Sequence, residues 1–320
     1  SDGANGLFAS FWGESFHLTE LDGASLLSEG ERAKVSELYR WTGSAIIDSS
    51  LLPCKDGGFI VALSSRKASA TVLELWYLKN GRARLDSSID GVDSLWSLEG
   101  FVGGALLAWS KKTEVCLAYL SNPSPEKRGK LEILWSGPSE RARSRASITV
   151  SKEGDRAIFE YDESLLGVRR VGGALELHNL PSWKPLERSV IGLCVPKGRE
   201  RFDLFYAEAL RPPLPLPVNL KFLSLVFDGK GLEIEEQGMM PGTVNRSIAR
   251  LELDKWGSLE LDGFRVLTMG GQIFVVDAKD SSLIRARAGF TNGFAYSPQI
   301  VDGVIMAPLD NGRVVACALR

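Results

Sequence analysis

The sequence predicts an all-β fold, and three observations support this prediction. Short apolar or alternating runs, typical of strands, fill most of the chain and are separated by Gly, Asp, Asn, Ser and Pro. Helical periodicity is nearly absent. The glycines that close successive sets of strands lie 46, 55, 46 and 51 residues apart, at Gly91, Gly137, Gly192, Gly238 and Gly289. Four strands in each period of about 40–50 residues are typical of a β-propeller, in which neighbouring sheets cover each other's faces.

The same order of strands repeats along the chain. New sets begin near residues 44, 92, 143, 191, 243 and 293. In the first of them, an Asn80-Gly81 pair typical of a tight hairpin joins two strands. The strand-like runs are 57–63, 72–78, 82–89, 103–109, 115–120, 131–135, 156–161, 174–180, 186–191, 202–207, 220–227, 232–236, 264–267, 272–277, 283–288, 304–307 and 314–319.

The two ends of the chain suggest how the repeat closes. Strand-like runs occur at 7–12 and 15–21, while 28–41 fits either a helical turn or, over 37–41, a strand. The last set lacks its outer strand, so we expect the N-terminal strands to pair with the C-terminal ones and leave no free edge. The prediction is one domain over 1–320 with seven four-stranded blades, six being the alternative.

The last two sets show a family resemblance. Residues 264–278 and 297–316, each with a strand, a Gly or Asp turn and a second strand, resemble the blade of quinoprotein-like (PQQ-repeat) propellers. The stretch Lys279–Leu283 lacks the Trp with which that blade usually ends, and the Trp-Asp and Gly-His signatures of WD40 repeats are missing. The resemblance therefore implies a divergent propeller related in kind to PQQ-repeat and WD40-like proteins.

Composition excludes several classes of protein. The 320 residues include 38 Lys and Arg against 40 Asp and Glu, a net charge of −2, which argues against general nucleic-acid binding. The longest nearly apolar run, Phe101–Trp109, is far shorter than the roughly 20 residues of a membrane-spanning helix. Residues 1–6 lack the basic and apolar regions of a signal peptide, although removal of one leaves an extracytoplasmic location open.

Cysteine and histidine usage bears on compartment and on metals. The four cysteines are far apart and show no zinc-type spacing, which favours buried free thiols and a reducing, cytoplasmic compartment. The Asn245-Arg246-Ser247 glycosylation motif is contrary evidence. With only His17 and His178, a histidine-rich zinc site is excluded. We therefore predict no metal and no cofactor.

No catalytic motif is recognisable. The chain lacks GxSxG, P-loop and GxGxxG-helix patterns, and its Gly pairs at 57–58, 103–104, 172–173 and 270–271 fit tight turns. The family's quinone enzymes often use a pair of adjacent cysteines, which this chain does not have. Carboxylates near 86–93 and 155–163 fit solvated turns better than an acid–base pair. We therefore predict no catalytic residues.

Three segments are candidates for binding a protein partner. An extended run would place Arg141, Arg143 and Arg145 on one side, where they suit an acidic partner. Polyproline geometry is expected around Pro212, Pro213 and Pro215, which makes that segment either a rigid loop or a docking arm. Among eight tryptophans, Trp183 and Trp256 sit at turns and are the likelier exposed contacts.

The leading hypothesis is a non-catalytic protein-interaction scaffold, a subunit of a larger assembly. It rests on the propeller pattern and partly on analogy, because fold does not fix function. One alternative is a glycosidase-like propeller enzyme with two facing carboxylates of raised pKa in its central channel. Another is a propeller that binds a small molecule or glycan in that channel.

Overall fold

The structure is a computed structural model, and it describes most of the chain. The described residues are 6–12, 15–21, 35–42, 45–67, 70–138, 146–161, 164–180, 189–209, 218–244, 256–261, 263–279, 284–290, 293–294, 298–301, 304–309 and 311–318. They form strands and turns without a helix, and so include no helix able to cross a membrane. The chain divides into two compact units, Ser1–Ile148 and Thr149–Arg320.

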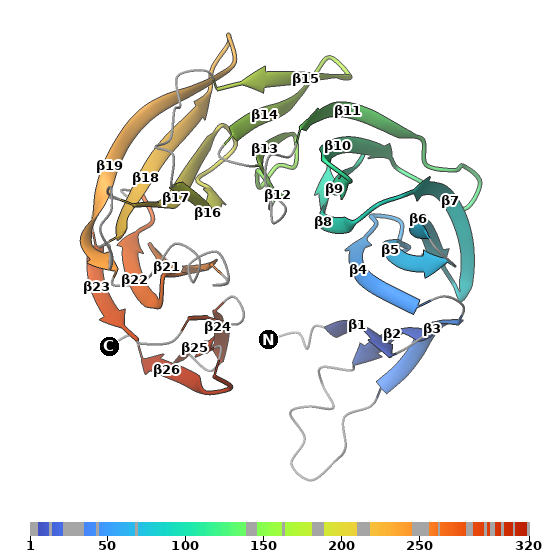
Figure 1. Ribbon diagram of the computed structural model, residues 1–320, viewed down its shortest axis with the longest axis horizontal. Coiled ribbons are helices and arrows are strands. Elements are labelled where there is room, and N and C mark those ends of the chain that lie inside the picture. The colour runs from blue at the N-terminus through green and yellow to red at the C-terminus, as the bar shows by residue number, and fades with distance from the viewer. Residues whose placement is uncertain are drawn as a thin grey trace. The chain divides into compact units, whose positions relative to one another are not determined.

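The first unit contains three antiparallel sheets, each with its strands in chain order (Figure 1). The first sheet has three strands, β1 (Gly6–Trp12), β2 (Ser15–Leu21) and β3 (Val35–Thr42). The second has β4 (Ala45–Pro53), β5 (Phe59–Lys67), β6 (Ala70–Lys79) and β7 (Arg82–Asp90). The third has β8 (Ser94–Phe101), β9 (Gly104–Lys111), β10 (Glu114–Ser121) and β11 (Leu131–Pro138).

The second unit contains four sheets of the same kind. The first has β12 (Ala146–Val150), which begins just before the boundary, β13 (Arg156–Tyr161), β14 (Ser164–Val171) and β15 (Ala174–Asn179). The next has β16 (Ser189–Pro196), β17 (Arg201–Ala209), β18 (Val218–Phe227) and β19 (Leu232–Val244). Then come β20 (Gly257–Leu261), β21 (Phe264–Met269), β22 (Gln272–Asp277) and β23 (Ile284–Gly289). The last sheet has β24 (Gln299–Val301), β25 (Val304–Pro308) and β26 (Val314–Ala318).

The structure describes seven sheets, which agrees with the prediction of seven blades, and five of these sheets have four described strands. The first and last sheets have three described strands each. In the described residues β1 pairs with β2, and β26 pairs with β25. Closure by pairing of the N- and C-terminal strands stays a prediction, as does the grouping of 1–320 into one domain.

Turn geometry confirms the role predicted for the paired glycines. Asn80 and Gly81 both have positive φ, 50° and 69°, as a type I′ hairpin requires, and they join β6 to β7. Gly172 and Gly173 join β14 to β15 with φ of 57° and 94°. At the N-terminal end, the strand alternative is confirmed, since Val35–Thr42 forms β3. The part of the helical alternative at 28–34 lies outside the described residues.

Packing between neighbouring sheets buries both faces of their central strands. In the first unit seven of the eight residues of β9 are buried, and Leu107 and Trp109 share a cluster with Leu73 and Leu75 of the preceding sheet. In the second unit Phe205 and Phe222 pack with Phe274 of the following sheet. The stability of each sheet therefore depends on its neighbours, as in other repeat folds.

Candidate functional site

Seven of the eight predicted partner-binding residues lie outside the described residues. They are Arg141, Arg143 and Arg145 in 139–145, Trp183 in 181–188, and Pro212, Pro213 and Pro215 in 210–217. Their role in binding stays a prediction.

Trp256 is the eighth candidate, and the structure describes it. Its half-buried indole precedes β20 and packs against the cluster that contains Phe205 and Phe274. A Cβ added at Gly192 would lie 2.1 Å from carbons of the indole ring, so the ring approaches the β16 backbone where only glycine fits. Among the described residues, none accepts a hydrogen bond from its buried Nε1. Trp256 therefore contributes to packing, and its part in partner binding stays a prediction.

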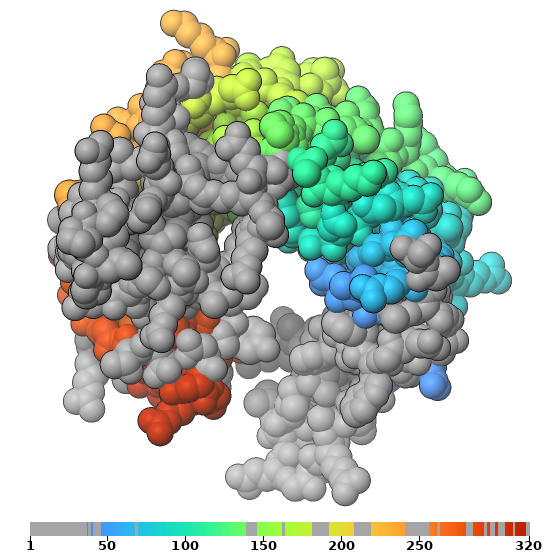
Figure 2. All heavy atoms as spheres, viewed as in Figure 1, coloured from blue at the N-terminus to red at the C-terminus, as the bar shows by residue number. Residues whose placement is uncertain are grey.

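The outer strand β11 is the most apolar exposed strand of the described four-stranded sheets. It reads Leu-Glu-Ile-Leu-Trp-Ser-Gly-Pro, and Ile133 is 60% exposed. Among the described strands, β11 pairs only with β10, so the main-chain groups of its other edge have no strand beside them. Figure 1 places β11 on the outside of its sheet, and its green atoms are uncovered in Figure 2. The strand thus combines an open edge with exposed apolar surface, a combination that native proteins usually avoid or use for binding.

Other outer strands of the four-stranded sheets carry polar side chains. β7 reads Arg-Ala-Arg-Leu-Asp-Ser-Ser-Ile-Asp, and β23 carries Arg285 and Arg287. β19 exposes Met239, also by 60%, but its exposed neighbours include Glu235, Glu236 and Gln237. Charges on edge strands oppose pairing with another strand. Among the outer strands of the described four-stranded sheets β11 is thus the most apolar, while the outer strand β26 of the last sheet, Val-Val-Ala-Cys-Ala, is also apolar and exposes Val314 by 53%.

A single arginine fixes the loop that leads into β11. Arg84 of β7 donates through Nη1 to the carbonyl oxygens of Ser124 at 2.8 Å and Pro125 at 3.0 Å, and through Nη2 to that of Lys127 at 2.8 Å. Its Nε donates to Asp86 at 2.7 Å, and Asp86 accepts the Gly129 N–H at 2.8 Å. The hydrogen bond with Asp86 raises the pKa of Arg84. This clamp holds the start of β11 against the preceding sheet.

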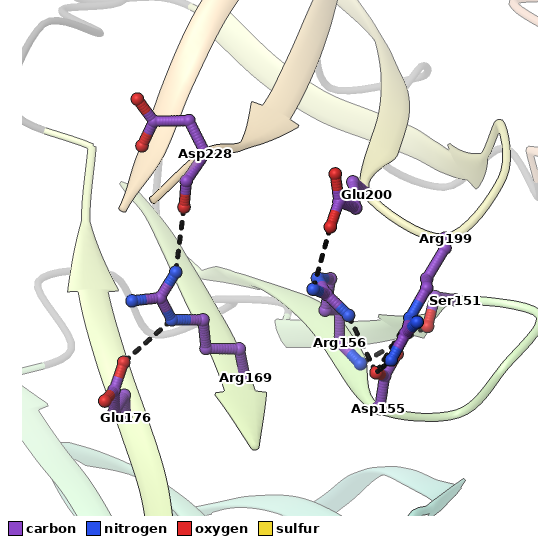
Figure 3. A network of polar contacts seen from close by, with 8 residues as sticks. All are labelled: Ser151, Asp155, Arg156, Arg169, Glu176, Arg199, Glu200 and Asp228. Carbon is purple, nitrogen blue, oxygen red and sulfur yellow. Dashed lines mark hydrogen bonds and ion pairs between the residues drawn. The ribbon is translucent and has the colours of Figure 1, made fainter. Parts of the chain in front are cut away.

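An ion-pair network joins two sheets of the second unit (Figure 3). Arg156 and Arg199 both point toward the Asp155 carboxylate (Figure 3). Each lies 2.7 Å from it, and Arg156 also lies 3.0 Å from Glu200. Burial opposes ionisation of Asp155, but hydrogen bonds from Arg199 and Arg156 outweigh it and lower its pKa. The network links the turn before β13 to the turn before β17.

A second link between the same two sheets lies beside this network. Arg169 of β14 donates to the Asp228 carbonyl oxygen at 2.8 Å and pairs with Glu176 at 2.7 Å. His178 lies 3.4 Å from the same carboxylate and packs edge-on against Phe227. These contacts make His178 part of the link between the two sheets.

A polar cavity of about 280 Å³ lies at the sheet of β16–β19. At its base, the fully buried Asp203 accepts a hydrogen bond from Ser224 Oγ at 2.7 Å. Arg265 Nη1 and Lys197 Nζ lie 3.4 and 3.6 Å from the other oxygen of Asp203. The sequence did not predict this cluster, because its residues come from three different strands and one turn.

Glu99 on β8 is a half-buried carboxylate, and burial raises its pKa despite a hydrogen bond from Ser97. The pKa of four other carboxyl groups, Asp56, Asp155, Glu176 and Asp228, is lowered by hydrogen bonds. A general acid needs a carboxyl group whose pKa is raised in this way, so Glu99 is a candidate for that role.

The four cysteines are free thiols, as predicted. Cys116 and Cys194 are buried, and Cys54 and Cys317 are half-buried. Burial, together with the charge of Asp56, raises the pKa of Cys54 to about 11, so its reactive thiolate is scarce at neutral pH. In the described part of the chain, no three His, Cys, Asp or Glu side chains gather as metal ligands would.

Comparison with known proteins identifies the architecture. No family model and no curated protein matches the chain. Among solved structures, the periplasmic gluconolactonase PpgL of Pseudomonas aeruginosa is 14% identical, covers 98% of this chain and 91% of its own, and superposes with a TM-score of 0.55. The fold is a β-propeller.

Two further propellers are more distant in structure. BamB from Moraxella catarrhalis is 10% identical over 99% of this chain and 82% of its own, with a TM-score of 0.49. The GH93 α-L-arabinofuranosidase of Fusarium graminearum, in complex with arabinobiose, is 13% identical over 85% of this chain and 91% of its own, with a TM-score of 0.44. Because a fold does not fix function, the function of this chain must be argued from its own residues.

Proposed function

We propose that this propeller is a non-catalytic protein-interaction scaffold, a subunit of a larger assembly that binds its partner along β11. The observation that carries the proposal is the pairing of an open strand edge with the exposed Ile133 on the same strand. An extended segment of a partner adds to such an edge through main-chain hydrogen bonds, while apolar side chains at alternate positions provide specificity.

Features around β11 support this binding mode. The Arg84 clamp orders the loop before the strand, so little conformational entropy is lost on binding. The predicted basic residues Arg141, Arg143 and Arg145 follow β11 closely in the sequence, although they lie outside the described residues. We therefore expect the partner segment to be apolar opposite Ile133 and acidic beyond Pro138.

The test compares two equally exposed apolar residues. The chain is affinity-purified from its native source, and the molar amount of co-purified partner is measured by mass spectrometry. Ile133→Asp should lower recovery by about tenfold or more, as expected for a central interface residue. Met239→Asp on β19 is the matched control and should leave recovery unchanged, because both residues are 60% exposed. Equal loss in both variants, or a wild-type chain that purifies alone, contradicts the proposal.

A propeller hydrolase is the second candidate, and Glu99 is the observation that favours it. A half-buried carboxyl group with a raised pKa can donate a proton to a leaving group. The wild-type chain and Glu99→Gln are assayed on a panel of chromogenic glycosides. Turnover by the wild type that Glu99→Gln abolishes would replace the scaffold proposal with the enzyme. The scaffold proposal expects no turnover from either protein.

The same proposal includes three statements about the repeat family, the domain organisation and the closure of the propeller. The blades are related to the quinoprotein-like repeat through 264–278 and 297–316, the whole chain forms one domain, and its terminal strands close the propeller. The polyproline segment around Pro212 and the turn tryptophan Trp183 then provide further contacts for partners. The repeated four-stranded sheets support these proposals.

A further inference from the structure

A cavity of about 510 Å³ lies in the first unit, between the β6–β7 hairpin and the loop that leads into β11. Three cationic side chains line it, those of Lys79, Arg82 and Arg84, and among the described residues no carboxylate does. Lys79 lies directly opposite Arg82 in the β6–β7 pairing, and Tyr77 lies opposite Arg84. Because side chains alternate along a strand, these four share one face of the hairpin. That face makes a cationic wall, which Pro125 faces from the loop.

The position of Lys79 is fixed by a carboxylate outside the cavity lining. Its Nζ lies 3.4 Å from Asp56, which also accepts a hydrogen bond from the Tyr77 hydroxyl. The hydrogen bond from Tyr77 is the main cause that lowers the pKa of Asp56, so this carboxylate is charged at neutral pH. Asp56 balances the charge of Lys79, whose ammonium group keeps further N–H donors for a second carboxylate.

The two arginines of the wall differ in how far their charges are balanced. Arg84 pairs with Asp86 at 2.7 Å, donates to the loop carbonyl oxygens and lies 5.3 Å from the centre of the Tyr77 ring. Arg82 is exposed, and among the described residues no carboxylate lies within ion-pair distance of it. The wall is therefore held in place by balanced charges, and Arg82 adds an unbalanced one.

The excess of positive charge continues over the surface around the cavity. The contacts of the wall link it to the turn 54–58 and the loop 122–130, and Figure 1 shows that loop beside β7. With 79–86, these segments form what we call the basic surface. It has seven cationic and three acidic side chains in a chain whose net charge is −2, and counting Glu132 at the start of β11 still leaves an excess of three. Its exposed cations, none with an ion-pair partner among the described residues, are Lys55, Arg82, Lys127, Arg128 and Lys130.

The size and chemistry of the basic surface favour an acidic protein segment over a nucleic acid. An excess of three or four charges suits a short acidic segment, whereas duplex-binding proteins often contact about six to ten phosphates. Single strands are bound by stacking of bases on aromatic rings. Tyr77 is 3% exposed and lies beneath the Arg84 guanidinium, so a base cannot stack on it. Ala83 and Pro125 instead give the cavity apolar walls that suit the methylene groups of a glutamate side chain.

We propose that the basic surface binds an acidic segment of a protein partner, with one carboxylate in the cavity between Lys79 and Arg82. Asp56 and the Arg84 clamp order the cavity before the partner arrives, so little conformational entropy is lost. The surrounding exposed cations attract the segment at longer range. The proposal goes beyond the role of β11, because an acidic segment can bind here without adding a strand to that edge.

The experiment is a fluorescence anisotropy titration of the full chain against hexaglutamate that carries a neutral dye, at low ionic strength. The expected result is a dissociation constant below about 0.1 mM that rises as salt is added, because salt screens exposed charges. Arg82→Glu should weaken binding by about tenfold or more, since it reverses a charge that lines the cavity. Arg128→Glu, on the basic surface but outside the cavity lining, should weaken it by about threefold.

The matched control is Arg66→Glu, which reverses an exposed arginine at the opposite end of β5 and changes the net charge by the same amount. Its affinity for hexaglutamate should equal that of the wild type, and thermal melting confirms that each variant is folded. The proposal is overturned if hexaglutamate does not bind at about 1 mM, or if Arg66→Glu and Arg82→Glu weaken binding equally.

Two further comparisons separate this proposal from its rivals. Tighter binding of an oligothymidylate of equal charge would overturn it in favour of nucleic acid. Hexaglutamate has no apolar side chain to place against Ile133, so its binding reports on the basic surface alone. The role proposed for β11, which is tested by recovery of the native partner, can therefore hold or fail separately.

Discussion

Two ion-pair sites of the second unit connect neighbouring sheets, and they differ in how deeply their side chains are buried. Asp203 on β17 meets Arg265 on β21, and their side chains are 0% and 2% exposed. Asp155, before β13, meets Arg199, before β17, and the Arg199 side chain is 61% exposed. Both sites join adjacent sheets. At the first site both partners are fully buried, whereas at the second the Asp155 side chain is 14% exposed and Arg199 stays open to water. We therefore expect the fold to depend more on the first site.

The largest expected effect comes from removing the buried carboxylate. Asp203→Ala should lower the free energy of unfolding by about 3–5 kcal/mol, because Arg265 and Lys197 lose their counter-charge. Asp155→Ala at the second site should cost about 1 kcal/mol, because Arg156 keeps Glu200 as a partner and Arg199 stays hydrated. Urea unfolding measures both. Replacing the buried pair together, Asp203→Leu with Arg265→Met, should recover much of the loss. Equal costs at the two sites would show that burial does not govern the difference.

An intermediate effect is expected at Arg84, which is partly exposed but fully hydrogen-bonded. Arg84→Met keeps the aliphatic stem and removes the donors to three loop carbonyl oxygens. We expect a loss of about 1–3 kcal/mol in the free energy of unfolding. Amide hydrogen exchange in 122–130 should become faster, while exchange in β5 stays unchanged. Unaltered exchange in the loop would mean that the clamp does not hold it.

The smallest effect depends on pH and belongs to Asp155. Its pKa in the folded chain is lowered below the ordinary 3.8, so its ion pairs stabilise the fold above that pH and are lost as pH falls through the folded-state pKa. Asp155→Asn should therefore melt slightly below the wild type between about pH 5 and 8. The two melting temperatures should converge as the pH falls through the folded-state pKa, because the wild-type carboxyl is then protonated as well. A constant difference down to acid pH would exclude ionisation as the cause.

The sequence predicted the repeat well because the repeat is local. Gly57, Gly103 and Gly270 have the positive φ expected of turn glycines, and the apolar runs became the central strands of their sheets. The first strands of several sheets, such as β8 and β12, were missing from the predicted runs because they mix polar and apolar residues. In Ser94-Leu95-Trp96-Ser97, for example, polar and apolar residues do not alternate strictly.

The contacts of the candidate sites could not be predicted in the same way. Arg84 binds carbonyl oxygens 40 or more residues away, and Arg265 meets Asp203 across 62 residues. Such pairs form because two repeats stack, and nothing in either local sequence marks them. The apolar run at Leu131–Trp135 was recognised as a strand, but its exposure follows only from its outer position.

The Arg84 clamp has a consequence for which residues of this chain can be exchanged during evolution. Its loop partners at Ser124, Pro125 and Lys127 are all main-chain oxygens, which every amino acid possesses. Gly129 is constrained, because a Cβ there would lie 2.9 Å from Leu120 and from the Ser121 carbonyl oxygen. The exposed residues between, such as Glu126 and Arg128, are free to be exchanged without loosening the attachment. The loop beside β11 is thus a position where new surface chemistry can be acquired, by evolution or by a protein engineer, on a support that stays the same.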